Sequence, residues 1–166
     1  MSSLALYVLA AMFSWVDPST HASFEPREVT VARYESIASD IALVSEESPV
    51  VDGDASHTAL VLASIASYES SYAARVDDCT KTGGSKSTRA YSIWQLQVTR
   101  GEACGSRLAA ARIARQMVED SLLSCRAEPL AVYAVGRCEP NAKARYRLSR
   151  AKRWWISNIF DIGGQT

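Results

Sequence analysis

The chain has 166 residues, of which 48% are hydrophobic and 22% are charged, and its 18 basic and 18 acidic side chains give a formal net charge of zero. This apolar content excludes a wholly disordered chain, and the length suits one compact domain. The balanced charge excludes a protein that is basic or acidic throughout its length.

The first expected element is an apolar helix over residues 4–15, which Asp17-Pro18 would end. No basic residue precedes it, whereas a secretory signal begins with a positive region, and the run is too short for a membrane span. We therefore expect a helix that packs on the domain, with a signal or signal-anchor segment as the alternative. Residues 1–27 form this N-terminal helix and loop, and residues 28–166 form the domain proper.

Apolar periodicity and capping residues indicate a mainly α chain with a small irregular or β-like loop region. Asp54 or Ser56 would cap a helix that runs to about residue 74, and Pro129 suits a first helical turn. Gly83-Gly84 indicates an irregular loop or short hairpin over residues 76–89, followed by a strand or extended loop. Together with the helix that runs to about residue 74, the expected helices cover residues 4–15, 29–45, 106–124, 129–135 and 142–157.

The four cysteines are Cys79, Cys104, Cys125 and Cys138, and the chain has only two histidines. Without a Cys-x-x-Cys pair, the pattern does not indicate a zinc site, and we expect no metal and no cofactor. An even count fits two disulfides and an oxidising compartment, with free thiols as the alternative. Of the three connectivities we favour Cys79–Cys104 with Cys125–Cys138, because each pair would staple a loop beside a helix.

The basic residues are unevenly distributed along the chain. Residues 1–75 contain three arginines and no lysine, whereas residues 126–153 contain eight basic side chains. A basic C-terminal face indicates an anionic partner, such as a cell-wall polymer, nucleic acid or lipid head groups. A solvated helix face is the alternative interpretation.

Glu69 is the candidate catalytic residue. Val61, Ile65, Tyr68 and Tyr72 recur at helical spacing and predict an apolar stripe, and Glu69 would lie at its edge near the helix end. Burial there disfavours the charged form of a carboxyl group, and a general acid for glycosidic bond cleavage needs the protonated form. A solvated surface glutamate is the alternative, since Tyr-Glu-Ser also occurs at residues 34–36.

Three short motifs follow one another in a telling order: Glu69-Ser70-Ser71-Tyr72, Ser92-Ile93-Trp94-Gln95 and Val132-Tyr133-Ala134-Val135-Gly136. In this order they resemble the lysozyme-like lytic transglycosylases, the soluble and goose-type branch of the lysozyme superfamily. The resemblance covers about residues 56–155. It departs from the family pattern at Ser92, where the family usually has glycine, and at Ala134, where it has asparagine.

The resemblance implies a lysozyme-like domain that cleaves the bond between N-acetylmuramic acid and N-acetylglucosamine in peptidoglycan. Glu69 would protonate the glycosidic oxygen and then act as the base that activates the 6-hydroxyl of the sugar or a water. The substrate-binding residues that the resemblance implies are Ser92, Gln95, Tyr133 and Tyr146.

A lysozyme-type hydrolase would need a second acid about 5–9.5 Å from the first. Asp77 and Asp78 are the nearby candidates, with exposed loop acids as the alternative interpretation. We therefore favour the one-carboxylate, transglycosylase-like mechanism.

On this interpretation the partner is the peptidoglycan glycan strand, no nucleic acid is bound and the protein is a monomer. Contact with a membrane through the N-terminal segment stays open. The expected location is the periplasm, the cell envelope or the extracellular space. A phage endolysin would also act there. Two other classes compete: a nucleic-acid-binding domain that uses residues 137–153 with Tyr146, Trp154 and Trp155, and a non-catalytic wall-binding protein of the same fold.

Overall fold

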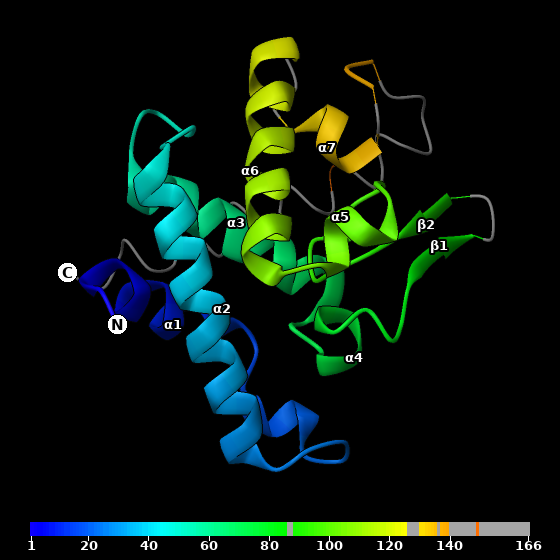
Figure 1. Cartoon of the computed structure of the whole chain (residues 1–166). Coiled ribbons are helices and arrows are strands. Elements are labelled where there is room, and N and C mark those ends of the chain that lie inside the picture. Colours follow the sequence, from blue (N-terminus) through cyan, green and yellow to red (C-terminus); the bar gives the residue numbers. More distant parts are fainter. Residues whose placement is uncertain (86–87, 126–129, 136, 140–148, 150–166) are drawn as a thin grey trace.

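The computed structural model describes residues 1–85, 88–125, 130–135, 137–139 and 149. Over these residues the chain is mainly α, as predicted, with one short antiparallel strand pair (Figure 1). The elements are α1 (Ser3–Trp15), the 3-10 turn η1 (Pro18–His21), α2 (Arg27–Glu47), α3 (Ala55–Ser70), α4 (Ala74–Asp77), β1 (Gly83–Ser85), β2 (Thr88–Ala90), α5 (Arg100–Cys104), α6 (Arg107–Ser124) and α7 (Ala131–Val135).

Helix α3 is the centre of the core. Every residue from Thr58 to Ser67 is buried, and the helix lies behind α2 and α6 in Figure 1. Helices α1, α2 and α6 pack around it, and all three contribute to one apolar cluster. The predicted amphipathic stripe is therefore wrong for this segment, because α3 is covered on all its sides rather than on one. Its neighbours in the cluster include Val8, Met12, Ile37, Ile41, Ala114 and Val118.

Helix α3 also ends earlier than the sequence predicts. Ser71 and Tyr72 have φ angles of 51° and 54°, and this left-handed backbone ends the helix after Ser70. The reversal turns the Tyr72 ring back into the core, where its hydroxyl donates to the Ala63 carbonyl at 2.8 Å. Tyr72 is therefore buried, as the apolar pattern indicates, but it lies beyond the helix.

The sequence analysis did not predict helix α5, near residue 100, although its Thr-x-x-Glu signature is present. Thr99 and Glu102 form a reciprocal capping box that starts this helix.

The predicted hairpin is found as β1 and β2, with Gly83 opposite Ala90. Asp54 is the N-cap of α3 and accepts from the His57 amide at 2.8 Å. The helix predicted over residues 142–157 lies outside the described residues, apart from Ser149.

The cysteine prediction is confirmed, including its pairing. Cys79–Cys104 joins the chain after α4 to α5, and Cys125–Cys138 joins the end of α6 to the segment after α7. No cysteine is free. Disulfides persist in oxidising compartments, so both bonds agree with the predicted environment. Within the described segments, the helices lack the combination of length and apolar character that crossing a bilayer requires.

Replacing Cys79 and Cys104 together by alanine should lower the free energy of unfolding by about 3–4 kcal/mol, because the bond closes a loop of 25 residues. The Cys125→Ala, Cys138→Ala pair, which opens a loop of 13 residues, should cost about 3 kcal/mol. Urea unfolding followed by circular dichroism measures both. Midpoints equal to that of the wild type would contradict a structural role for these bonds.

Candidate functional site

A pocket of about 480 Å³ opens where α3 emerges from the core. Its walls come from the C-terminal end of α3, the segment before α2, α4 with the chain that follows it, and the loop after β2. The charged, amide and aromatic side chains that line it include Phe24, Glu25, Glu69, Arg75, Lys81 and Gln95. The pocket therefore joins a candidate from the first motif, Glu69, to one from the second, Gln95.

Glu69 lies in the last turn of α3 and is half-buried, like its neighbours Tyr68 and Ser70. The helix is buried up to Ser67 and reaches the pocket only here. Its final turn is closed by the Ser71 amide, which donates to the Ser67 carbonyl at 2.8 Å. The buried helix thus fixes where the carboxyl group of Glu69 stands.

Polar side chains from η1 and α2 hold the reversal that follows α3. His21 Nε2 donates to the Ser71 carbonyl at 2.9 Å, and since a carbonyl only accepts, this nitrogen carries a proton. Arg33 Nε donates to the Tyr72 carbonyl at 3.1 Å. The rings of Tyr34 and Tyr72 meet edge to face with centroids 5.0 Å apart. The N-terminal half of the chain therefore anchors the end of the helix that carries Glu69.

The second motif forms a tight loop. Backbone hydrogen bonds of 3.0 and 2.8 Å between Tyr91 and Leu96 close it, and Ser92 and Gln95 have φ angles of 61° and 51°. Glycine takes this left-handed conformation most readily, and Ser92 takes it at the position where the resembled family has glycine. The Ser92 side chain is buried and its hydroxyl accepts from the Trp94 amide, whereas Gln95 lines the pocket. Ser92 therefore shapes the loop from inside.

Trp94 connects this loop to both neighbouring motifs. Its indole Nε1 donates to the Leu62 carbonyl of α3 at 3.0 Å, and its own carbonyl accepts from the Tyr133 hydroxyl of α7 at 2.8 Å. Burial raises the pKa of the Tyr133 hydroxyl well above its usual range, and Glu69, when ionised, raises it further. Tyr133 and Glu69 thus lie within electrostatic range, so elements from all three motifs converge on this side of the fold.

Asp77 and Asp78 have structural partners. Asp77 accepts from Arg107 Nη1 at 2.7 Å, and the same guanidinium donates to Asp40 at 2.7 Å. Burial raises the pKa of Asp77, and the positive charge of Arg107 opposes that rise. Asp78 accepts from the Thr80 amide at 2.9 Å and from its hydroxyl at 2.7 Å. Neither carboxylate is among the residues that line the pocket.

The sequence analysis missed one wall of the pocket, which comes from the segment between η1 and α2. The Phe24 side chain is 77% exposed there, and the neighbouring Glu25 is largely buried. Burial raises the pKa of Glu25, but hydrogen bonds from Arg33 and Thr30 outweigh it, and the net pKa lies below the usual value. No short-range pattern could have shown this wall, because 44 positions separate Glu25 from Glu69 in the sequence.

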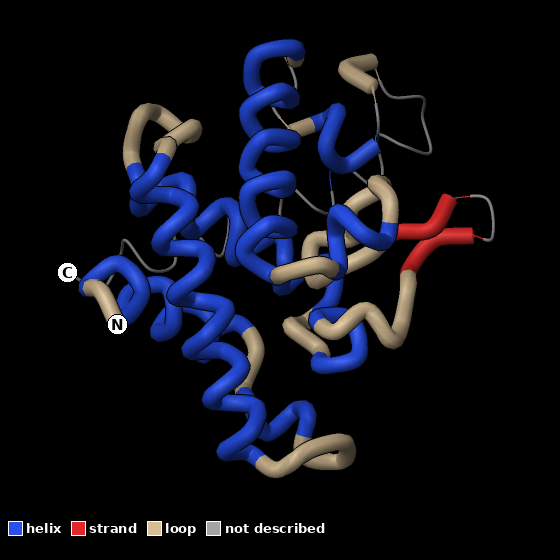
Figure 2. The backbone as a smooth tube through the Cα atoms, in the orientation of Figure 1, coloured by secondary structure: helices blue, strands red, loops and turns tan. Residues whose placement is uncertain are grey.

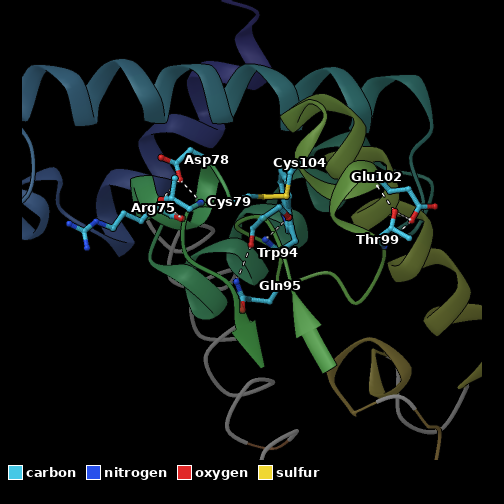
Figure 3. The surroundings of a disulfide bond; sticks show 10 residues. Arg75, Asp78, Cys79, Trp94, Gln95, Thr99, Glu102 and Cys104 are labelled. Carbon is cyan, nitrogen blue, oxygen red and sulfur yellow. Dashed lines mark hydrogen bonds between the residues drawn. A yellow bond between two sulfur atoms is a disulfide. The ribbon is translucent and has the colours of Figure 1, made fainter. Parts of the chain in front are cut away.

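Another wall of the pocket carries two exposed cations, Arg75 and Lys81, on a segment that the Cys79–Cys104 disulfide holds in place. Figure 3 shows the Arg75 side chain directed away from the disulfide and Gln95 on the far side of Trp94. The Gln95 side chain packs directly on Gly83, where an added Cβ would lie 1.7 Å from Gln95 Oε1. Its Nε2 donates to the Ser92 carbonyl at 3.1 Å, so the backbone fixes this side chain.

Tyr146, Trp154 and Trp155 lie outside the described residues, as does most of the basic stretch after Arg137. In the part of the chain that the structure describes, no three His, Cys, Asp or Glu side chains gather as a metal site would require. Comparison of the chain with models of known protein families, with curated proteins and with solved structures gave no match.

Replacing Gly83 by alanine should displace the Gln95 side chain, because the new methyl group would occupy the position of its amide. We expect the side-chain amide resonances of Gln95 to shift in a ¹⁵N correlation spectrum while the fold persists. Gly101→Ala is the matched control, since an added Cβ there meets nothing within 4 Å. Unchanged Gln95 resonances in the Gly83 variant would contradict this packing.

Proposed function

We propose that the protein cleaves the glycosidic bond between N-acetylmuramic acid and N-acetylglucosamine in peptidoglycan, as a lytic transglycosylase does. The observation that carries the proposal is the meeting of Glu69 and Gln95 in one pocket, with Tyr133 within electrostatic range of Glu69. These residues come from the three motifs on which the resemblance rests. Packing that brings them together supports a common role.

The surroundings of Glu69 suit a general acid. Partial burial and the negative end of a helix dipole both favour the neutral form of a carboxyl group, and Glu69 is half-buried in the last turn of α3. A carboxyl group that keeps its proton near neutral pH can give it to a leaving oxygen.

The reaction proceeds through Glu69 in two roles. Its proton moves to the glycosidic oxygen as the bond from that oxygen to C1 of the muramic acid breaks, and the electron pair leaves with the oxygen. The Glu69 carboxylate then takes the proton of the 6-hydroxyl of the same sugar while that oxygen bonds to C1. The product is a 1,6-anhydro sugar, and Glu69 is protonated again.

The pocket walls supply groups that suit a glycan with acidic substituents. The exposed Phe24 ring offers an apolar face to a sugar ring, and Gln95 offers an amide held at a fixed position. Arg75 and Lys81 suit the lactyl and peptide carboxylates of peptidoglycan.

The substrate also fits the disulfides. Peptidoglycan lies outside the cytoplasm, and both cysteine pairs are of a kind that persists in oxidising compartments. We therefore propose action in the periplasm, the cell envelope or the extracellular space, and a lysis protein of a phage would meet the same substrate. A hydrolase that uses Asp77 as its second acid fits this structure less well, since Asp77 is not among the residues that line the pocket.

Glu69→Gln should reduce the release of soluble fragments from dye-labelled peptidoglycan by at least about 10²–10⁴-fold, because glutamine fills the same space but has no proton to give. The melting temperature should stay close to that of the wild type, since the change is nearly isosteric. Asp78, the residue just after α4, provides the comparison: Asp78→Asn should retain most of the activity. Full activity of Glu69→Gln would end this proposal.

Arg75→Ala with Lys81→Ala should raise KM about 3- to 10-fold with kcat unchanged, since exposed charges contribute modestly to binding and do not touch the reacting bond. Added salt should shrink the difference from the wild type, because it screens exposed charges. Arg100→Ala removes an exposed cation of α5 that is not among the pocket residues, and should leave KM unchanged. Equal KM values for the two variants would contradict a role of these cations in binding.

A further inference from the structure

We propose that Glu25 is a second catalytic carboxylate of this pocket, and that it stabilises the positive charge that develops at C1 of the muramic acid during cleavage. The inference rests on the proposed function and adds to it a residue from the N-terminal segment. Glycosidic cleavage passes through a transition state with oxocarbenium character, and a fixed negative charge beside the sugar ring lowers its energy.

The geometry of Glu25 fits that role. Its side chain is 12% exposed and lines the same pocket as Glu69, from the wall formed between η1 and α2. The Thr30 hydroxyl donates to Oε1 at 2.7 Å, and Arg33 Nη1 forms an ion pair with the same oxygen. Both contacts fall on Oε1, so Oε2 is the oxygen that a ligand in the pocket would meet.

Arg33 also sets the position of Glu25 relative to Glu69. The Arg33 side chain is only 9% exposed, and its Nε donates to the carbonyl of Tyr72, two residues past the end of α3. One guanidinium thus holds both the second carboxylate and the reversal that ends the helix of the first. This arrangement links the positions of two carboxyl groups from distant parts of the sequence through one side chain.

The two carboxyl groups stand in different surroundings. Glu25 has a cation and a hydroxyl donor on one oxygen, and these lower its net pKa despite burial, so it is negatively charged at neutral pH. Glu69 stands at the negative end of a helix. Two carboxyl groups whose environments differ in this way can divide the work between a charged stabiliser and a proton donor.

Glu25 forms no bond to the sugar in this scheme and transfers no proton. Proton transfer to the glycosidic oxygen and from the 6-hydroxyl stays with Glu69, so the product is still the anhydro sugar. Arg33 and Thr30 are positioning residues, which act by holding Oε1.

The test compares Glu25→Gln with Glu28→Gln on purified peptidoglycan. Glu28 is an exposed acid in the first turn of α2, close in sequence but not among the pocket residues. Glu25→Gln should lower kcat about 10²-fold or more, with KM within about twofold of the wild type, because the lost interaction belongs to the transition state. Glu28→Gln should match the wild type, and the anhydro product should be unchanged in both.

A purely structural Glu25 would give a different result. If Glu25→Gln lowers the melting temperature but the folded protein keeps the kcat of Glu28→Gln, the inference is overturned. It is also overturned if Glu25→Gln changes the products, since that would make Glu25 the base for a water. Should Glu25→Gln fail to fold, Glu25→Ala assayed with and without formate replaces it: restoration of kcat by the small carboxylate supports the role, and no restoration overturns it.

These outcomes separate the inference from the proposed function. An active wild type, an inactive Glu69→Gln and a fully active Glu25→Gln would remove the second carboxylate and leave the proposed function standing. A wild type that releases nothing from peptidoglycan would overturn both.

Discussion

The pocket depends on the burial of Trp94 between α3 and α7. Its indole N–H donates to a backbone carbonyl in the middle of α3, and its own carbonyl accepts the hydroxyl of Tyr133. A buried indole that lost its partner would leave a donor unsatisfied, which costs about 1–3 kcal/mol, so the ring has one favourable place. The loop on either side must then reverse tightly, and it does so with left-handed backbone at Ser92 and Gln95. Placing Trp94 therefore places Gln95 on the pocket wall.

A second reversal, at Ser71 and Tyr72, determines where the central helix stops. Without it α3 would continue past Glu69, and the pocket would not open there. The reversal is held from the N-terminal half by His21 and Arg33, each bonded to a carbonyl just after the helix. Turn η1 and helix α2 thus do more than cover the core. Figure 2 shows α1 and α2 on one side of the molecule and the strand pair on the other, with α3 between them.

Several features of the fold could be predicted because they rest on local patterns. Helical periodicity gave the mainly α class, Asp54 and Ser106 stand at helix starts where polar caps belong, and the even cysteine count gave both disulfides. The end of α3 could not be predicted, because the sequence stays compatible with a helix to residue 74 and only the tertiary burial of Tyr72 breaks it. Helix α5 was missed although the Thr99 and Glu102 signature was present, since it is only five residues long.

The residues of the candidate site also differ in whether a local sequence pattern could predict them. Glu69 and Gln95 were found from short motifs, whereas Phe24 and Glu25 carry no motif and reach the pocket only through the packing of α2 on α3. Their contribution requires contacts between residues far apart in the chain, which a single sequence does not encode in any local pattern. Asp77 shows the reverse case, since its place just after the helix suggested a catalytic acid and its ion pair with Arg107 gives it a structural task.

The central claim is that this pocket cleaves peptidoglycan by an intramolecular attack, and the mass of the released fragments tests it most directly. Purified sacculi are incubated with the wild-type protein, and the soluble muropeptides are analysed by mass spectrometry. The account predicts fragments that end in anhydro-muramic acid, each lighter by one water than the hydrolysed fragment. Fragments with reducing ends would contradict the intramolecular step, and the absence of any soluble fragment would contradict the proposed function itself.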